Sequence, residues 1–280
     1  MTSYYNELDP YAAQWLRNLI AAGHIAPGDV DERSITEVRP DDLRPYTQCH
    51  FFAGIGGWSR ALRLAGWGDD RAVWTGSCPC QPFSAAGQGK GFDDERHLWP
   101  AWFNLIRECQ PAIVFGEQVD AAIRHGWLDL VSSDLEGIGY AFGAAGLPAA
   151  SVGAPHIRQR LWFVADAAGE RRIGQRVLLR LDESGRNAEA FSEIARSGAI
   201  SSMGNADDEG SQGRWLGGDG FWRQTELIAC RDGKARPVEP GIFPLANGVS
   251  ARVGKLRAAG NAIVPQVAAE FIHAYEFSRC

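Results

Sequence analysis

The stretch that decides the fold is Gly76-Ser77-Cys78-Pro79-Cys80-Gln81-Pro82-Phe83-Ser84, a turn of small residues and prolines. It follows the apolar run Arg71-Ala72-Val73-Trp74, which predicts a short strand. A cysteine between a proline and a glutamine at the end of a strand projects its sulfur from rigid backbone, as a nucleophile requires. Cys80 is therefore a candidate nucleophile. The alternative is that Cys78 and Cys80 are ordinary buried thiols, because free cysteine is among the most buried residue types.

Composition narrows the classes of protein. The six cysteines, at positions 49, 78, 80, 109, 230 and 280, form neither a disulfide framework nor the paired spacing of a zinc site, so we expect reduced thiols and no metal. No apolar run approaches the roughly 18 residues that a membrane span needs, and no basic-then-apolar leader opens the chain. These features predict a soluble cytoplasmic protein of one or two domains with no membrane partner.

The charge is divided unevenly along the chain. The net charge of −6 argues mildly against a nucleic-acid partner, because phosphate binding requires Lys and Arg. Residues 1–150 hold 11 basic and 19 acidic side chains, whereas residues 151–260 hold 16 basic and 13 acidic. We therefore expect any DNA contact mainly on the second half.

Strand and helix patterns alternate over most of the chain, which predicts an α/β fold. Asp9 and Pro10 begin a helix that Gly23 ends, and later helices are expected at about 58–65, 98–109, 127–135 and from Pro265 onward. Strands are expected at 3–7, 48–52, 111–115, 149–152 and 161–165, and a turn at Gly28-Asp29-Val30. From Asp166 to about Glu239 the periodicity is lost, which indicates a loop-rich region.

Five motifs together identify a resemblance. They are Phe51-Phe52-Ala53-Gly54-Ile55-Gly56-Gly57, Pro79-Cys80-Gln81, Phe115-Gly116-Glu117-Gln118-Val119, Gly153-Ala154-Pro155-His156-Ile157-Arg158-Gln159-Arg160 and Gly260-Asn261-Ala262-Ile263-Val264-Pro265. In combination they resemble the DNA cytosine-5 methyltransferase family, although Gln118, His156 and Ala262 depart from its usual residues. The resemblance assigns the nucleophile to Cys80 rather than to Cys78.

The resemblance implies a Rossmann-like class I methyltransferase fold, a mostly parallel sheet with a small loop-rich target-recognition domain. The catalytic domain would comprise residues 1–165 and 245–280, and the target-recognition region residues 166–244. S-adenosylmethionine would be the cofactor and double-stranded DNA the partner of a monomeric enzyme.

The order of the motifs departs from the family. Only one helix fits between Gly57 and Pro79, where the family normally has two further strand units. The missing segments resemble Asn6-Glu7-Leu8-Asp9 and Gly28-Asp29-Val30 at the front of the chain, which implies a permuted arrangement. A right-handed crossover from the 48–52 strand to the nucleophile strand would then place the 58–65 helix on the opposite face from its usual one. The sequence leaves open whether it does.

The resemblance also assigns roles to residues. Cys80 would attack carbon 6 of cytosine, Glu117 would protonate or hydrogen-bond N3, and Arg160 would bind O2. Arg158 and Arg160 would both help to stabilise the thiolate. Glu7 would accept from both ribose hydroxyls and Asp29 from the adenine amino group; the alternative is that both are solvated loop acids. The remaining cofactor residues would be Phe52, Gly54, Gly56, Gly57, Val30, Pro79 and Asn261. DNA contacts are expected from Gln81, Ser84, Gln88 and Arg96, with the target base rotated out of the duplex.

Three functions remain open from the sequence. The first is a DNA cytosine-5 methyltransferase, for example one that belongs to a restriction-modification system. The second is a tRNA cytosine-5 methyltransferase, because the catalytic residues would be shared. The third is a non-catalytic DNA-binding accessory protein that keeps the fold, against which the intact set Cys80, Glu117, Arg158 and Arg160 argues.

Overall fold

The computed structural model describes residues 2–79, 98–124, 126–154, 156–168, 226–229, 235–238 and 260–279. The chain divides into two compact units, one made of Met1–Pro148, Arg158–Arg171 and Leu245–Cys280, the other of Ala149–Ile157 and Arg172–Pro244. Within the described residues of the second unit are a short 3-10 helix, η3 (Ala149–Val152), and an antiparallel pair of strands, β8 (Glu226–Ala229) and β9 (Ala235–Val238). The predicted 166–244 region therefore lies largely outside the described residues.

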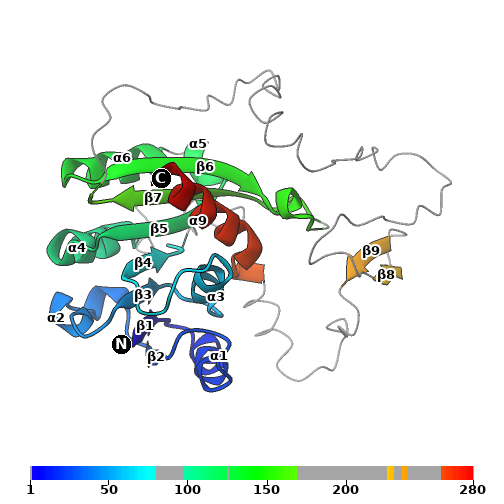
Figure 1. Cartoon of the computed structure of the whole chain (residues 1–280), viewed down its shortest axis with the longest axis horizontal. Coiled ribbons are helices and arrows are strands. Elements are labelled where there is room, and N and C mark those ends of the chain that lie inside the picture. Colours follow the sequence, from blue (N-terminus) through cyan, green and yellow to red (C-terminus); the bar gives the residue numbers. More distant parts are fainter. Residues whose placement is uncertain are drawn as a thin grey trace. The chain divides into compact units, whose positions relative to one another are not determined.

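The first unit is built on a seven-stranded sheet in the order β2-β1-β3-β4-β5-β7-β6 (Figure 1). Five neighbouring strands are parallel, and β7 runs antiparallel to both β5 and β6. The strands are β1 (Ser3–Asn6), β2 (Gly28–Asp31), β3 (Gln48–Phe51), β4 (Val73–Gly76), β5 (Ile113–Val119), β6 (Ala141–Pro148) and β7 (Gln159–Asp166). This is the mostly parallel, Rossmann-like sheet that the resemblance implies.

Helices cover both faces of this sheet. They are α1 (Pro10–Ala21), α2 (Pro40–Leu43), α3 (Gly57–Leu64), α4 (Trp99–Cys109), α5 (Ala121–Arg124), α6 (Trp127–Gly137) and α9 (Pro265–Arg279), with a 3-10 turn η1 (Ile35–Glu37). Asp9 caps α1 by accepting from the backbone N–H groups of Tyr11 and Ala12, as the sequence predicts. No helix among the described residues has both the length and the apolar character to cross a membrane.

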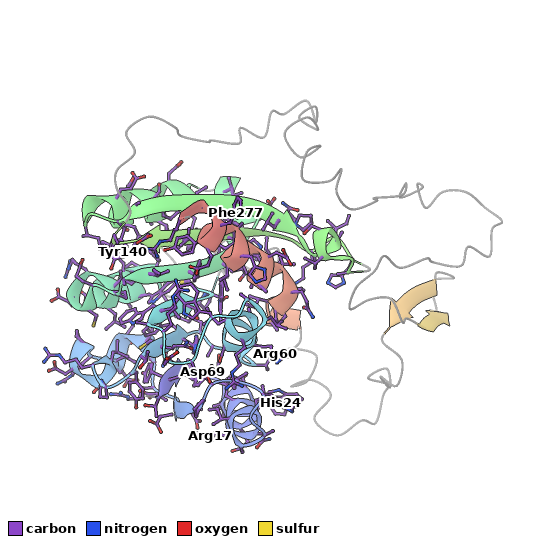
Figure 2. All side chains as sticks on the ribbon, in the orientation of Figure 1. Arg17, His24, Arg60, Asp69, Tyr140 and Phe277 are labelled. Atoms are coloured by element: carbon purple, nitrogen blue, oxygen red, sulfur yellow. The ribbon has the colours of Figure 1, made fainter. Side chains whose placement is uncertain are left out.

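Two rows of register partners face opposite sides of the sheet, because successive side chains of a strand alternate. One row packs with α4 and α6 and consists of Tyr4, Cys49, Trp74 and Val114. The next row faces α1, α3 and α9 and consists of Tyr5, His50, Thr75 and Phe115. Figure 2 shows Tyr140 on the α4 side and Arg60 on the α3 side.

The crossover β3-α3-β4 has the opposite hand to its neighbours. The units β1-α1-β2 and β3-α3-β4 step across the sheet in opposite directions, yet α1 and α3 cover the same face. The unit β4-α4-β5 steps in the same direction as β3-α3-β4, with its helix on the other face. Two units therefore share one hand and β3-α3-β4 alone has the other. Since parallel crossovers are right-handed almost without exception, β3-α3-β4 is left-handed.

The permuted arrangement explains this hand. The two N-terminal strands lie beside β3, on the side away from β4, as the permutation predicts. Keeping α3 on the face of α1 while the chain proceeds directly to β4 requires a left-handed connection. The structure thus answers the question that the sequence leaves open, and a right-handed crossover does not occur here.

Two glycines, one on β4 and one on β5, leave space for aromatic rings between these two strands and the helix α4. Gly76 and Gly116 are register partners. A Cβ at Gly76 would lie 2.6 Å from ring atoms of Trp102, and one at Gly116 would overlap the ring of Phe163. Because no side chain stands there, the rings pack directly on the backbone just before Ser77 and Glu117.

Two local predictions are wrong. Residues 28–30 form the edge strand β2 rather than a turn, because parallel pairing with β1 outweighs the turn tendency of Gly and Asp. The strand expected at 149–152 is the η3 helix, and the strand lies earlier, at β6. Its sequence is rich in Ala and Gly, so it carries little strand signal, and its pairing with β7 determines its conformation.

Candidate active site

The glycine-rich turn after β3 is joined to the end of β1 through Glu7. One carboxylate oxygen of Glu7 accepts from the backbone N–H of Gly54 at 2.7 Å, and the other from that of Asp9 at 2.9 Å. Gly54 has a φ of +56°, and a Cβ there would meet no atom within 4 Å. The turn thus combines left-handed backbone, open space and a neighbouring carboxylate, which suits the close approach of a small molecule.

The other segment of the predicted cofactor site lies on the edge strand. Asp29 is the second residue of β2, and its carboxylate accepts from the Tyr46 hydroxyl at 3.0 Å. Both Asp29 and Val30 line an open hollow of about 420 Å³, whose lining does not include Glu7. The structure therefore joins Glu7, but not Asp29, directly to the glycine turn.

Asp31 rather than Asp29 lies at the carboxyl end of β2. It pairs in register with Asn6, and its carboxylate accepts from the Tyr4 hydroxyl at 2.7 Å and from the Arg33 guanidinium. Although partial burial opposes it, hydrogen bonding from Arg33 and Tyr4 lowers the pKa of Asp31. The strand end is thus held by an ionised carboxylate.

The buried Glu117 forms an ion pair with the partly exposed Arg160. They lie on the neighbouring strands β5 and β7, with Arg160 Nε 3.0 Å from Glu117 Oε1, and the Glu117 side chain is only 9% exposed. Burial raises the pKa of Glu117 above its ordinary value, while Arg160, Ser77 and Arg158 lower it in part. A carboxyl group in this environment is suited to holding and releasing a proton.

Gln118 supports the turn that leads to Cys80. Its side-chain amide donates to the carbonyl of Cys78 at 3.2 Å, and its own oxygen accepts from the backbone N–H of Val119 at 2.9 Å. The family has asparagine here, and the longer amide still reaches the turn. Pro79 is the last residue described before a gap, and Cys80 itself lies outside the described residues.

Arg158 lies next to the ion pair but contacts another segment. Its guanidinium donates to the carbonyls of Gly260, at 3.0 Å, and Ala262, at 2.6 Å. Its φ is +38°, and it lies just before β7, which begins at Gln159. Burial and the charge of Arg160 lower the pKa of Arg158.

The segment before α9 lies beside the glycine turn. A Cβ at Gly57 would be 2.6 Å from Ile263 Cγ1, so the backbone of the turn meets this segment directly. Asn261 is exposed between the two residues whose carbonyls bind Arg158. The structure thereby brings together Gly57, Asn261 and Arg158 from distant parts of the sequence.

Four predicted DNA-contacting residues, Gln81, Ser84, Gln88 and Arg96, lie outside the described residues. One residue beside this site, Ser77, was missed by sequence reasoning, because its place three residues before Cys80 gave no signal by itself. Its hydroxyl oxygen accepts from the indole N–H of Trp58 at 3.1 Å. Leu8, which follows Glu7, is 64% exposed. The described part of the chain has no cluster of His, Cys, Asp and Glu that could hold a metal ion.

Comparison with known proteins gives a family match. The family described as C-5 cytosine-specific DNA methylase matches residues 68–236, which is more than half of the chain. Among curated proteins, the chain is 32% identical over 99 residues to the type II methyltransferase M.HhaI of Haemophilus parahaemolyticus, covering 34% of this chain and 30% of that protein. It is 34% identical over 95 residues to M.AplI of Arthrospira platensis, covering 33% and 28%. The matches thus span about a third of these relatives.

Solved structures give weaker similarity. The DNMT2 mutant of Spodoptera frugiperda has a TM-score of 0.42 at 15% identity, covering 62% of this chain and 44% of that one. The methyltransferase EhMeth of Entamoeba histolytica has a TM-score of 0.42 at 14% identity, covering 61% and 47%.

Proposed function

Because the chain belongs to the C-5 cytosine-specific DNA methylase family, we propose that it methylates carbon 5 of cytosine in double-stranded DNA through a covalent Cys80 adduct. The observation that carries this proposal is the ion pair between the buried Glu117 and Arg160, on the strand next to β4, after which the chain leads to Cys80. A carboxyl group with a raised pKa beside a cation is what protonation of a pyrimidine nitrogen requires.

The cofactor side of the proposal rests on the glycine turn. S-adenosylmethionine, when bound, supplies an electrophilic methyl group. Glu7 would accept from its ribose hydroxyls, since each carboxylate oxygen that holds Gly54 or Asp9 has a second acceptor position. The exposed Leu8 would cover an apolar face of the adenine, and Asp29 would accept from the adenine amino group. The open space at Gly54 leaves room for this ligand.

The thiolate of Cys80 would form a bond to carbon 6 of the cytosine while Glu117 gives its proton to N3. Carbon 5 then becomes the nucleophilic end of an enamine and takes the methyl group. Arg160 would bind O2 and stabilise the carboxylate that Glu117 becomes, as its present 3.0 Å contact supports. Loss of the carbon 5 proton to a base, departure of Cys80 and return of the N3 proton to Glu117 restore the aromatic ring.

Arg158 would act mainly on position rather than on charge. Its two bonds to the carbonyls of Gly260 and Ala262 hold the Asn261 segment against the glycine turn. The methyl donor and the catalytic strand would then keep a constant separation. The region 166–244 would contact the DNA, and Gln81, Ser84, Gln88 and Arg96 would hold the rotated-out nucleotide.

The test offers duplex DNA and tRNA to the protein in one assay with a labelled methyl donor. We expect 5-methylcytosine in the DNA and a covalent adduct with 5-fluorocytosine DNA, both absent in Cys80→Ala. Methylation of tRNA alone would move the activity to the second function considered from the sequence. DNA binding with neither methylation nor adduct would leave an accessory role and refute the proposal.

A further inference from the structure

The segment that leads to Cys80 has few backbone donors with which to fix itself. The strand β4 ends at Gly76, and the sequence continues as Ser77-Cys78-Pro79-Cys80-Gln81-Pro82. Its two prolines have no backbone N–H and cannot donate a hydrogen bond. Donors on neighbouring side chains are therefore more important for the position of this segment.

The first such donor is the indole of Trp58. Its N–H donates to the hydroxyl oxygen of Ser77 at 3.1 Å, and because an indole nitrogen can only donate, the direction of this bond is fixed. Trp58 is 3% exposed. The centroid of its ring lies 6.3 Å from that of Phe115, which stacks on it, and 5.5 Å from that of Trp162, which meets it edge-on. The packed indole cannot turn away, so it holds Ser77 from α3.

The second donor is the side-chain amide of Gln118 on β5. Its nitrogen donates to the carbonyl of Cys78 at 3.2 Å, while its oxygen accepts from the backbone N–H of Val119 at 2.9 Å. The bond from Val119 determines which end of the amide faces Cys78. The Gln118 side chain is buried, so water does not compete for these bonds. Two adjacent residues are thus held by donors from two different elements.

These two elements also carry the other groups of the proposed reaction. Trp58 is the second residue of α3, which begins at the glycine turn where the methyl donor would bind. Gln118 directly follows Glu117, the proposed acid. We propose that Trp58 and Gln118 are positioning residues, which hold Ser77–Cys78 at a constant distance from the glycine turn and from the acid. The proposal rests on the function proposed above, in which Cys80 attacks the cytosine.

The first test is a double-mutant cycle on the bond between Trp58 and Ser77. Single-turnover methyl transfer at saturating DNA and S-adenosylmethionine is measured for Trp58→Phe, Ser77→Ala and the double variant. We expect each single variant to be about fivefold slower. The double variant should be no slower than the slower single variant, because all three lack the same hydrogen bond.

The affinities for both ligands separate positioning from binding. They should stay within about twofold of the wild type in all three variants, because the bond acts on the nucleophile and not on a ligand. Single variants as fast as the wild type would overturn the proposal. So would losses that multiply to about 25-fold in the double variant, since the two side chains would then act independently.

The second test removes the amide of Gln118. Gln118→Met keeps the length of the side chain but loses both hydrogen bonds, so we expect single-turnover methyl transfer to fall by about tenfold. The matched controls are Trp67→Phe and Gln48→Met. Trp67 and Gln48 are also buried, and both donate to the carbonyl of Arg71 at 3.2 Å, where the chain enters β4 rather than leaves it.

Both controls should methylate at the rate of the wild type, because they lose the same chemical groups away from the nucleophile. If the controls were slowed as much as Trp58→Phe and Gln118→Met, a general loss of stability would explain the rates and the proposal would be overturned. Ser77→Ala replaces Trp58→Phe in this comparison if the latter does not fold.

A third measurement reads the held segment without using the reaction. Amide hydrogen exchange is followed by mass spectrometry in a peptide that covers residues 76–81. We expect protection in the wild type, about fivefold faster exchange in Trp58→Phe and in Gln118→Met, and no change in the two controls. Equal exchange in the wild type and in all four variants would overturn the proposal.

The readouts separate the two proposals. If the wild type transfers no methyl group and forms no adduct, the proposed function is refuted, while hydrogen exchange still shows whether Trp58 and Gln118 hold the segment. An active wild type whose variants keep its rate and its exchange would refute only the positioning role.

Discussion

The units β1-α1-β2 and β3-α3-β4 are built from the same parts but connected with opposite hands. Each has a parallel strand pair and a helix on the face that carries Tyr5 and Phe115. The first follows the usual right-handed rule, and the second does not. The comparison shows that a helix can lie on the same face of this sheet whichever way the chain crosses to the next strand.

The unusual hand is supported by contacts between the two units. Ser59 on α3 accepts from the backbone N–H of Ala26 and hydrogen-bonds with the Tyr5 hydroxyl, both at 3.0 Å. Arg63 on α3 donates to the carbonyl of Gly23 at the end of α1. These bonds hold α3 on the face of α1 although the chain leaves it toward β4.

The largest expected effect tests whether β1-α1-β2 contributes to the cofactor site at the glycine turn of β3-α3-β4. Glu7→Ala should weaken S-adenosylmethionine binding by about 100-fold, because two hydrogen bonds to a charged group would be lost together with the tie to Gly54. Calorimetric titration measures the affinity, and circular dichroism checks the fold. Glu108→Ala, at an exposed pair with Arg107, is the control. An unchanged affinity in Glu7→Ala would separate the two units and remove the permuted cofactor site.

The next effect concerns the stability contribution of His50, which lies where β1-α1-β2 and β3-α3-β4 meet. His50 on β3 stacks on Tyr5 of β1 at 4.9 Å and shares a 2.7 Å hydrogen bond with Thr75 of β4. Burial lowers the pKa of His50 from 6.5 to about 3. The neutral form is thus stabilised in the folded protein, so this contribution is complete above pH 6.5 and is lost as the pH falls toward 3.

Between pH 7 and pH 5 the free energy of unfolding should therefore fall by about 2 kcal/mol from this group alone. Urea unfolding at both pH values measures the change. His50→Gln should lose this part of the pH dependence, even if it is less stable at pH 7. An equal pH dependence in the variant would mean that the junction between the units does not exclude water from His50.

A smaller effect measures how closely the two helices approach. Gly56 and Gly66 flank α3 with φ values of +80° and +72°. A Cβ at Gly56 would lie 3.1 Å from Ile25 and 3.3 Å from Leu16 of the first unit, whereas at Gly66 it would meet nothing within 4 Å. Both Ala substitutions carry the backbone penalty, but only Gly56→Ala adds overpacking, so it should cost about 1–2 kcal/mol more. If both variants lose the same unfolding free energy in thermal or urea unfolding, the contact between Gly56 and the side chains of Ile25 and Leu16 adjusts without cost.

The smallest expected effect comes from restoring the usual chain order. Ser3, Gln48 and Val73 are register partners at the amino edge of the sheet, so short linkers could insert residues 2–46 between α3 and β4. If neighbours matter and order does not, S-adenosylmethionine affinity should stay within about threefold of that of the natural chain. A loss of binding in a folded rearranged protein would mean that the left-handed connection itself shapes the site.

Much of this fold could be predicted because its signals are local. Asp9 and Pro10 indicate the start of α1, and apolar runs indicate β3 and β5. The edge strand β2 and the strand β6 could not be found in this way, since Gly, Asp and Ala favour other structures in isolation. Their conformation comes from pairing with neighbours that lie elsewhere in the sequence.

The site shows the same division. The motif positions of Glu117 and Arg160 indicate that they meet, and they do. The partners of Arg158 could not be predicted, because a positive φ at a non-glycine residue turns its side chain to the carbonyls of Gly260 and Ala262. Nor does any pattern reveal that the Trp58 indole donates to Ser77.

The position of α9 at the end of the chain has a consequence for folding during synthesis. Phe271 and Tyr275 of this helix cover Phe115, and Glu276 binds Arg71 in a bidentate pair 205 positions apart in the sequence. During synthesis, the side of β5 that carries Phe115 stays uncovered until α9, some 150 residues later in the sequence, has emerged from the ribosome. During this interval chaperones that recognise apolar surface would find their substrate, and nascent chains stalled before α9 should aggregate.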